Sequence, residues 1–200
     1  MKKILGVTLF VALIVGLWVL FLHKKPHDES PKQEALKVGN HSAEFNKSVS
    51  EVVTAYLALK DAFVDADNAK IKEQQKQLTT AIDSIKIDEL KKDTSGIFQS
   101  VQAQLGDIKA NAEAIAGETT INDMRQDFRM VSENLFPLLK TIHYEGAKLY
   151  WQNCPMAFGE GKDASWLSNT KEINNPYLGK NHPEYKGTML HCGEIQDTIQ

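Results

Sequence analysis

The chain has 200 residues, a formal net charge of −3 and 24% charged residues. Nucleic-acid-binding proteins usually present a basic face, so this charge balance argues against that class of protein. None of the P-loop, GxSxG, HExxH or Rossmann glycine motifs occurs in the sequence, so no common enzyme family is indicated. The length is typical of one domain with a short appendage.

The chain begins with a hydrophobic segment. Lys2 and Lys3 precede a run from Ile4 to Leu22 that contains no charged residue. At about 1.5 Å per helical residue this run spans roughly 29 Å, enough to cross the hydrocarbon core of a bilayer. The basic segment 23–26 follows it, in place of the small residues that a signal-peptide cleavage site requires. We therefore predict that residues 1–25 form an uncleaved signal-anchor transmembrane helix in the inner membrane, with the remaining residues in the periplasm.

A polar segment follows the predicted anchor. Residues 26–41 contain two prolines and show no hydrophobic periodicity. Such a composition is typical of a flexible tether between a membrane anchor and a folded domain. We predict that these residues form a linker.

From Ser42 onward, apolar residues recur at three- and four-residue steps, the pattern of amphipathic helices. Thr120 predicts the N-cap of the last of these helices, and Pro137 predicts a kink inside it. Four amphipathic helices with short connections fold most simply as a bundle. The predicted fold is therefore all-α, an antiparallel up-down four-helix bundle over residues 42–152. The four apolar stripes are Phe45, Val49, Val52, Val53, Tyr56, Leu59 and Phe63; Ile71, Leu78, Ile82 and Ile85; Ile97, Val101, Leu105, Ile108, Ala112 and Ile115; and Ile121, Met124, Phe128, Val131, Leu135, Leu138 and Ile142.

The last part of the chain is rich in Gly, Asn, Asp and Pro. Such a sequence is too interrupted for a long helix, because these residues favour turns. We predict that residues 153–200 form an irregular, loop-rich subdomain with a short hairpin or helical turn. Trp151, Trp166, Tyr177 and Leu178 are expected to hold this subdomain against the bundle.

Both cysteines of the chain lie in this subdomain, each close to a methionine, as Cys154-x-Met156 and Met189-x-x-Cys192. Thiolates and thioethers are soft donors that select Cu(I) over ions such as magnesium or calcium. His191 is the auxiliary candidate ligand because it precedes Cys192 directly. The alternative is a structural disulfide between Cys154 and Cys192 beside two core methionines, which requires Cα atoms roughly 4.4–6.8 Å apart.

The C-terminal part contains four short motifs: CPMA, WLS, INNPYLG and ML-CGE, the first and last of which contain the cysteines. Two helical stretches further upstream, residues 56–62 and residues 125–133, accompany these motifs. Together they resemble an uncharacterised bacterial domain of unknown function, over about residues 43–197. That domain occurs alone in small exported proteins and at the C-terminus of periplasmic adaptor subunits of heavy-metal (copper/silver) efflux pumps. The resemblance implies metal handling and no enzyme activity.

Three classes of function follow from these observations. The first is a membrane-anchored, extracytoplasmic module that binds a soft metal such as copper and works with heavy-metal efflux or homeostasis components. The second is a non-catalytic interaction module, a helical bundle whose Cys154–Cys192 disulfide is purely structural. The third is an enzyme, which we do not expect, since no nucleophile–base pair or acid pair stands out. The doubled cysteine–methionine pairing favours the first class, because a disulfide has no use for the two thioethers.

Overall fold

The computed structural model describes residues 41–93 and 95–199. These residues belong to one compact unit. No helix within the two described ranges is long and apolar enough to cross a membrane. The predicted anchor, residues 1–25, and all but the last residue of the predicted linker lie outside the described residues.

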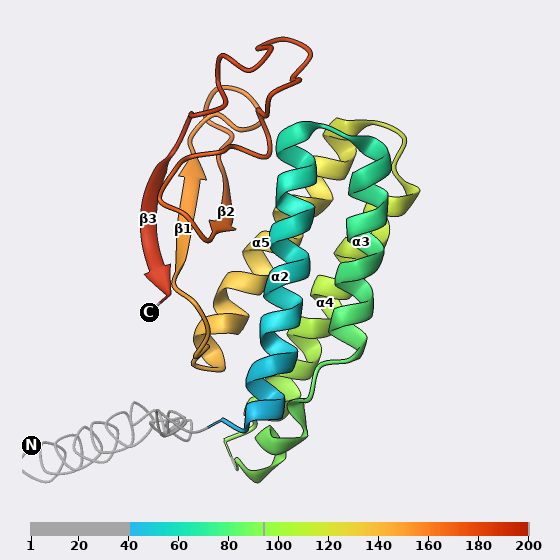
Figure 1. Cartoon of the computed structure of the whole chain (residues 1–200), viewed down its shortest axis with the longest axis vertical. Helices are drawn as coiled ribbons and strands as arrows, with labels where there is room; N and C mark the ends of the chain where they lie inside the picture. Colours follow the sequence, from blue (N-terminus) through green and yellow to red (C-terminus); the bar gives the residue numbers. More distant parts are fainter. Residues whose placement is uncertain (1–40, 94, 200) are drawn as a thin grey trace, which may run out of the picture. The chain divides into compact units, whose positions relative to one another are not determined.

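Four α-helices form the main body of the described unit (Figure 1). Each helix packs against the next along the chain, and the connections between α2 and α3 and between α4 and α5 are short. Short connections of this kind make sequential helices antiparallel neighbours. The predicted four-helix bundle is therefore confirmed, with a 3₁₀ helix added between α3 and α4. The helices are α2 (Ala43–Asp65), α3 (Asn68–Asp83), η1 (Ile87–Lys92), α4 (Ile97–Gly117) and α5 (Ile121–Thr141).

Side-chain caps fix where three of these helices begin. The Ser42 hydroxyl accepts a hydrogen bond from the Phe45 amide at 3.1 Å. Asp67 and Thr120 cap α3 and α5 in the same way, with bonds of 3.1 Å and 3.2 Å to backbone amides. Such caps satisfy amide groups that have no partner within the helix. Behind the caps, the predicted stripes are buried in one core, apart from Ile85 and Ile121, which lie at its edge.

The C-terminal part differs from the all-α prediction. Residues 153–200 were expected to be irregular, but the chain forms a three-stranded antiparallel sheet in the order β2-β1-β3. Its strands are β1 (Leu149–Cys154), β2 (Ala164–Ser168) and β3 (Glu194–Ile199). β2 is buried along its whole length, whereas β3 is mostly exposed and forms the outer edge.

The boundary between bundle and sheet also differs from the prediction. The bundle was expected to continue to residue 152, but α5 ends at Thr141 and β1 begins at Leu149. His143 has a φ of 48°, a left-handed conformation that ends the helix. A turn at Gly146 follows, where any side chain would overlap the Tyr144 ring. Pro137 lies inside α5 and does not end it.

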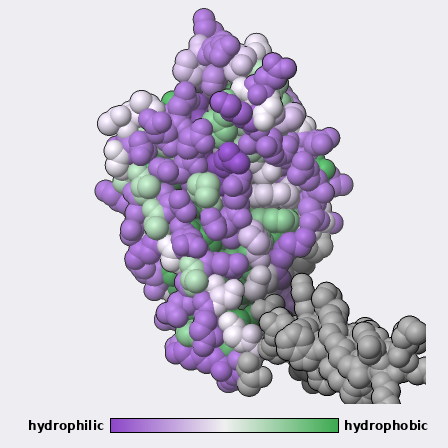
Figure 2. All heavy atoms as spheres, turned by 180° about the vertical axis from the view of Figure 1, so that it is seen from behind, coloured by the Kyte–Doolittle hydropathy of each residue, from purple (hydrophilic) through white to green (hydrophobic). Residues whose placement is uncertain are grey.

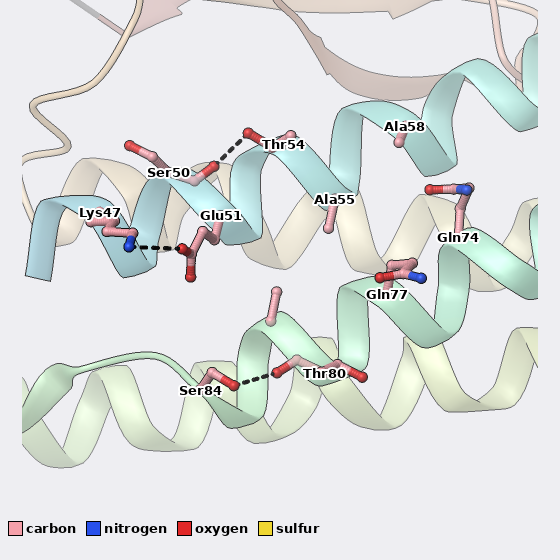
Figure 3. Close-up of a pocket in the computed structure, with 11 residues that line it drawn as sticks. Lys47, Ser50, Glu51, Thr54, Ala55, Ala58, Gln74, Gln77, Thr80 and Ser84 are labelled. Carbon is pink, nitrogen blue, oxygen red and sulfur yellow. Dashed lines mark hydrogen bonds and ion pairs between the residues drawn. The ribbon is translucent and has the colours of Figure 1, made fainter. Parts of the chain in front are cut away.

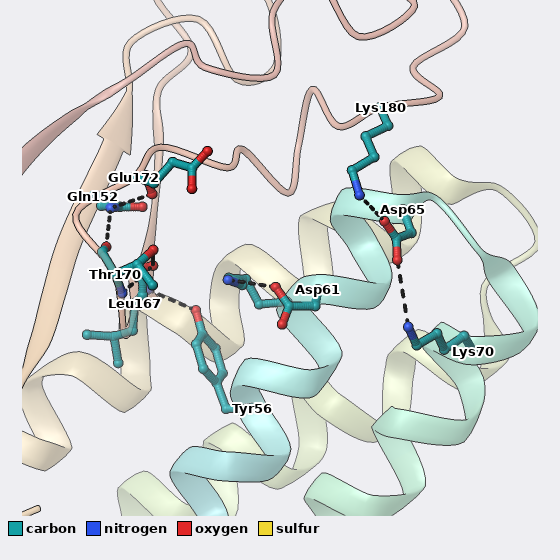
Figure 4. A network of polar contacts seen from close by, with 11 residues as sticks. Tyr56, Asp61, Asp65, Lys70, Gln152, Leu167, Thr170, Glu172 and Lys180 are labelled. Atoms are coloured by element: carbon teal, nitrogen blue, oxygen red, sulfur yellow. Dashed lines mark hydrogen bonds and ion pairs between the residues drawn. The ribbon is translucent and has the colours of Figure 1, made fainter. Parts of the chain in front are cut away.

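A chain of buried hydrogen bonds holds the sheet on the bundle, and Figure 4 shows its first bond, between Leu167 and Tyr56. The Leu167 amide of β2 donates to the Tyr56 hydroxyl at 3.1 Å, and this hydroxyl lies 2.7 Å from Ser132 Oγ. Ser132 Oγ in turn donates to the Phe128 carbonyl at 3.0 Å, so Tyr56 is the donor to Ser132. Burial raises the pKa of Tyr56 well above its ordinary value, so this hydroxyl keeps its proton. β2 therefore docks on α2 and α5 through a specific bond as well as by packing.

The surface is predominantly polar. Figure 2 shows one face of the molecule on which hydrophobic residues form isolated spots among hydrophilic ones. Among the described residues, the large hydrophobic side chains that are clearly exposed are Met130 on α5 and Ile195 on β3. Met124, one and a half turns before Met130, is buried. Of these two methionines of α5, one is thus a surface residue and the other packs in the core.

Candidate functional site

The sheet brings the two cysteines together. Cys154 ends β1 and is fully buried. The preceding residue, Asn153, pairs with Glu194 of β3, so the chain reaches Cys192 immediately beyond the end of this ladder. The Cys154 and Cys192 thiols lie near one another, close enough for the Cys154 thiol to influence the pKa of Cys192, and both cysteines are free. The structure therefore juxtaposes two residues that lie far apart in the sequence.

Gly193 makes this approach possible. Its φ is 142°, and a Cβ atom built on it would lie 2.8 Å from the Asn153 carbonyl oxygen and 3.0 Å from the Trp166 ring. A side chain at this position would push the start of β3 away from β1. Glycine is therefore needed for Cys192 to lie beside Cys154.

The Cys192 thiol has a raised pKa. Burial, followed by the hydrogen bond and charge of the Cys154 thiol, raises the pKa of Cys192 to about 12. Deprotonation of both neighbouring thiols without a metal ion is unfavourable, because the two negative charges repel in a site with little solvent. A soft cation removes this penalty by supplying positive charge, since metal binding displaces thiol protons. Two thiolates with neighbouring thioethers fit the ligand preferences of Cu(I).

The two methionines lie in turns next to the cysteines. Met156 begins the turn after β1, and its carbonyl accepts from the Gly159 amide at 3.1 Å. Met189 lies in the loop before β3, and its carbonyl accepts from the Cys192 amide at 3.0 Å. Both side chains are partly buried and pack on the core. Each methionine is therefore held by a backbone turn within three residues of a cysteine.

His191 and His143 have different positions. His191 is exposed, and its Nδ1 lies 2.7 Å from the Ile173 carbonyl oxygen, which leaves Nε2 as its free nitrogen. His143 precedes β1, whereas Cys154 ends it, and the strand alone spans about 16 Å. Within the described ranges, no three His, Cys, Asp or Glu side chains form a group that could hold a metal ion. A site at the cysteines would use sulfur donors.

Asn175 supports the cysteine loop, a role that the sequence reasoning missed. Its side-chain amide donates to the Cys192 carbonyl at 2.9 Å, and its backbone amide donates to the Leu190 carbonyl at 2.9 Å. Its side-chain oxygen accepts from the amides of Tyr177 and Leu178. Asn175 is fully buried, so these bonds hold the loop from inside. The Asn-Pro pair in the INNPYLG motif was the available signal, because such pairs favour turns.

The aromatic side chains near the site serve packing, as predicted. Trp166 and Tyr177 are buried with their rings edge to face at 6.0 Å, and the Tyr177 hydroxyl donates to the Ser165 carbonyl at 2.7 Å. Trp151 is partly buried and stacks on Phe136 of α5 at 4.3 Å. These contacts hold the sheet and its loops on the bundle.

A groove of about 620 Å³ lies between α2 and α3, away from the sheet (Figure 3). Its polar side chains bond largely within their own helices: Lys47 pairs with Glu51 at 4.0 Å, and Thr54 donates to the Ser50 carbonyl at 2.7 Å. Alanines, including Ala55, form part of its floor. This arrangement offers no nucleophile beside a base, so the cysteine pair is the stronger candidate site.

A family model described as "Protein of unknown function (DUF3347)" matches residues 52–146. This range runs from within α2 to just beyond α5, so the helical part of the chain is similar to an uncharacterised domain of unknown function. The match ends before Cys154 and does not test the C-terminal motifs or their link to efflux pumps. Neither a curated protein nor a solved structure matches the chain significantly.

Proposed function

We propose that this protein is an extracytoplasmic soft-metal-binding module in which Cys154 and Cys192 hold one Cu(I) ion. The observation that carries the proposal is the closeness of the two cysteines at the end of β1, where the pairing of Asn153 with Glu194 brings Cys192 toward Cys154. Thiolates are the protein ligands with the greatest preference for Cu(I), and two of them can balance its charge.

The surroundings of the thiols support the same proposal. Met156 and Met189 lie in turns beside the two cysteines, where a neutral thioether can add a soft ligand without giving up a proton. Asn175 holds the Cys192 loop through its side chain. Ligands that are held in place before the ion arrives reduce the ordering cost of binding. His191 is an auxiliary ligand in this proposal, through its Nε2 atom.

The cellular role proposed here follows from the anchor segment and from the resemblance described above. An inner-membrane anchor in residues 1–25 would keep the folded unit in the periplasm. There the module would bind copper for heavy-metal efflux or homeostasis components. No catalytic role is included, and nucleic acid is not among the proposed partners.

The second candidate is a non-catalytic interaction module with a structural disulfide. The same closeness of the two cysteines supports it, because neighbouring thiols in an oxidising compartment can form a Cys154–Cys192 bond. The two candidates differ in the role of the methionines, which a disulfide does not require.

A competitive Cu(I) titration distinguishes them. The full chain in detergent is reduced and titrated without oxygen against a Cu(I) chelator, and we expect about one tightly bound ion. Cys154→Ser or Cys192→Ser should each lower the affinity by about tenfold or more, because a thiolate is lost. Met156→Leu/Met189→Leu should weaken binding with little change in stability, since Leu and Met exchange at low cost in packed sites.

The matched control is Met124→Leu, the same substitution at a buried position on α5. It should leave copper affinity unchanged. If the Met156→Leu/Met189→Leu variant binds as tightly as the Met124→Leu variant, the thioethers are not ligands. If the reduced parent binds no copper, the metal proposal fails and the disulfide candidate replaces it.

A further inference from the structure

A second hollow, independent of the cysteine pair, lies between the start of α5 and two loops. Its volume is about 300 Å³, and its walls come from residues 122–126, residues 157–162 and residues 177–185. Part of the wall is apolar: the Phe158 and Tyr177 rings meet at 5.3 Å, and Leu178 lies beside them. Small-molecule sites are usually concave and largely apolar, with a few polar groups that orient the ligand.

The polar group in this hollow is the guanidinium of Arg125. The residue is 1% exposed and lines the cavity. Nε donates to the Pro176 carbonyl at 3.3 Å and Nη1 donates to Asn122 Oδ1 at 3.4 Å, both long for hydrogen bonds. Nη2 is buried and has no acceptor among the described residues. One edge of the guanidinium, Nη2 with the second N–H of Nη1, is therefore left without an acceptor.

Within residues 41–93 and 95–199, no carboxylate forms an ion pair with Arg125. Burial alone lowers the pKa of Arg125 to about 10, so the group stays charged at neutral pH. One turn later on α5, Arg129 pairs with Glu133 at 2.6 Å, and this hydrogen bond raises the pKa of Arg129. A buried cation without a partner is costly, and an unsatisfied buried group in a native structure calls for a physical explanation.

The other charged groups around the cavity lie toward solvent. Lys162 and Glu184 line it and are exposed, with opposite charges. His182 also lines the cavity. Burial lowers the pKa of His182, the nearby Arg125 charge lowers this pKa further, and the Glu184 carboxylate raises it. Arg125 lines the cavity together with His182, so its charge lies on the cavity side. The interior of the cavity therefore carries one unbalanced positive charge.

We propose that Arg125 anchors a binding site for a small carboxylate, whose two oxygens accept from Nη1 and Nη2 while its apolar part lies against Phe158 and Leu178. A planar guanidinium edge matches a carboxylate through two parallel hydrogen bonds. A single buried cation balances a monoanion better than a doubly charged phosphate. The carboxylate belongs either to a free small acid or to the C-terminus of a peptide.

Calorimetry on the full chain in detergent tests this site. We expect benzoate to bind and benzamide, its neutral isostere, to bind at least about tenfold more weakly. A tripeptide ending in phenylalanine, with a free or an amidated C-terminus, tests the peptide source in the same way. If neither carboxylate binds at millimolar concentration, or if benzamide binds as well as benzoate, the proposal is overturned.

Two arginine variants on one helix provide a matched comparison. Arg125→Met should weaken benzoate binding by about ten- to a hundredfold, the loss of a charged hydrogen-bonded pair. It should leave the melting temperature unchanged or raised, because an unpaired buried charge is removed. Arg129→Met should leave benzoate binding unchanged. A lowered melting temperature in Arg125→Met with undiminished benzoate affinity would show that Arg125 is only structural.

Arg125→Lys and His182 give readouts that do not depend on the stability of the methionine variant. Arg125→Lys keeps the charge and loses the two-point geometry, so benzoate binding should still weaken. Benzoate should also raise the pKa of His182, followed by NMR, because it neutralises the charge that lowers it. Unchanged affinity in Arg125→Lys together with an unmoved His182 pKa would overturn the proposal.

Discussion

Replacing Tyr56 with phenylalanine tests how the sheet is attached to the bundle. The substitution keeps the ring, which stacks on Phe128 at 5.4 Å, and removes only the buried hydroxyl. The Leu167 amide of β2 then loses its acceptor at a fully buried position. Ser132 Oγ keeps its own bond to the Phe128 carbonyl, so the main cost is one orphaned amide. An unsatisfied buried donor costs about 1–3 kcal/mol, which is the loss we expect in the free energy of unfolding.

Urea unfolding provides the assay, with far-UV circular dichroism reporting on the helices and tryptophan fluorescence reporting on the sheet. The control is Tyr150→Phe on β1, a partly exposed position where the substitution should cost under about 0.5 kcal/mol. In a double-mutant cycle, Tyr56→Phe should couple to Ser132→Ala, because the two hydroxyls share a bond of 2.7 Å. Equal losses for Tyr56→Phe and Tyr150→Phe would refute the hydrogen-bond account of docking.

Three further predictions concern the backbone, the core and the acid response. Gly193→Ala should destabilise the fold by about 1–3 kcal/mol, because the φ of Gly193 is 142° and the added Cβ would meet a β1 carbonyl. Gly106→Ala, which has open space around it in α4, should stabilise the fold by about 0.5–1 kcal/mol. Thermal unfolding measures both variants, and equal effects would contradict this reading. Leu105→Ala in the core of α4 should cost about 2–4 kcal/mol in urea unfolding, and a loss below about 0.5 kcal/mol would show that this face is not buried. Lys180 lowers the pKa of Asp65 through a hydrogen bond of 2.7 Å. The stability that this partly exposed pair contributes is therefore present above the unfolded carboxyl pKa of 3.8 and is lost as the pH falls below that value. NMR titration should find a higher Asp65 pKa in Lys180→Met, and an unchanged pKa would contradict the pairing.

The helices were predictable because their signals are local. Each stripe repeats within one segment, and caps such as Ser42 and Thr120 act on amides two or three residues away. The core positions follow from the same periodicity, including Met124 on the buried face of α5. No knowledge of distant contacts was needed for these features.

The sheet depends on distant contacts and gave a weaker signal. β2 is buried on both faces, so its residues show no alternation that would mark a strand. β1 pairs with β3, which lies forty residues further along the chain, and this register depends on Gly193. Leu149 and the two aromatic residues after it favour a strand, but they directly follow a helical pattern that appeared to continue. The contact between the two cysteines is a product of this register.

Arg125 shows what a periodicity analysis can overlook. It lies four residues after Ile121 and three before Phe128, on the apolar face of α5. A charged residue at such a position must be paired or pay the cost of burial. Arg125 is buried within this face. The loops that cover Arg125 determine which groups it can bond to, and the helical pattern carries no information about these loops.

X-ray absorption at the copper edge tests the central proposal most directly. The reduced full chain is loaded with one equivalent of Cu(I), and the first coordination shell is measured in the parent and in the Cys154→Ser/Cys192→Ser variant. We predict that sulfur dominates the shell in the parent and that this sulfur signal is lost in the double variant. A shell of nitrogen and oxygen, or the same spectrum from both proteins, would contradict a copper site at Cys154 and Cys192.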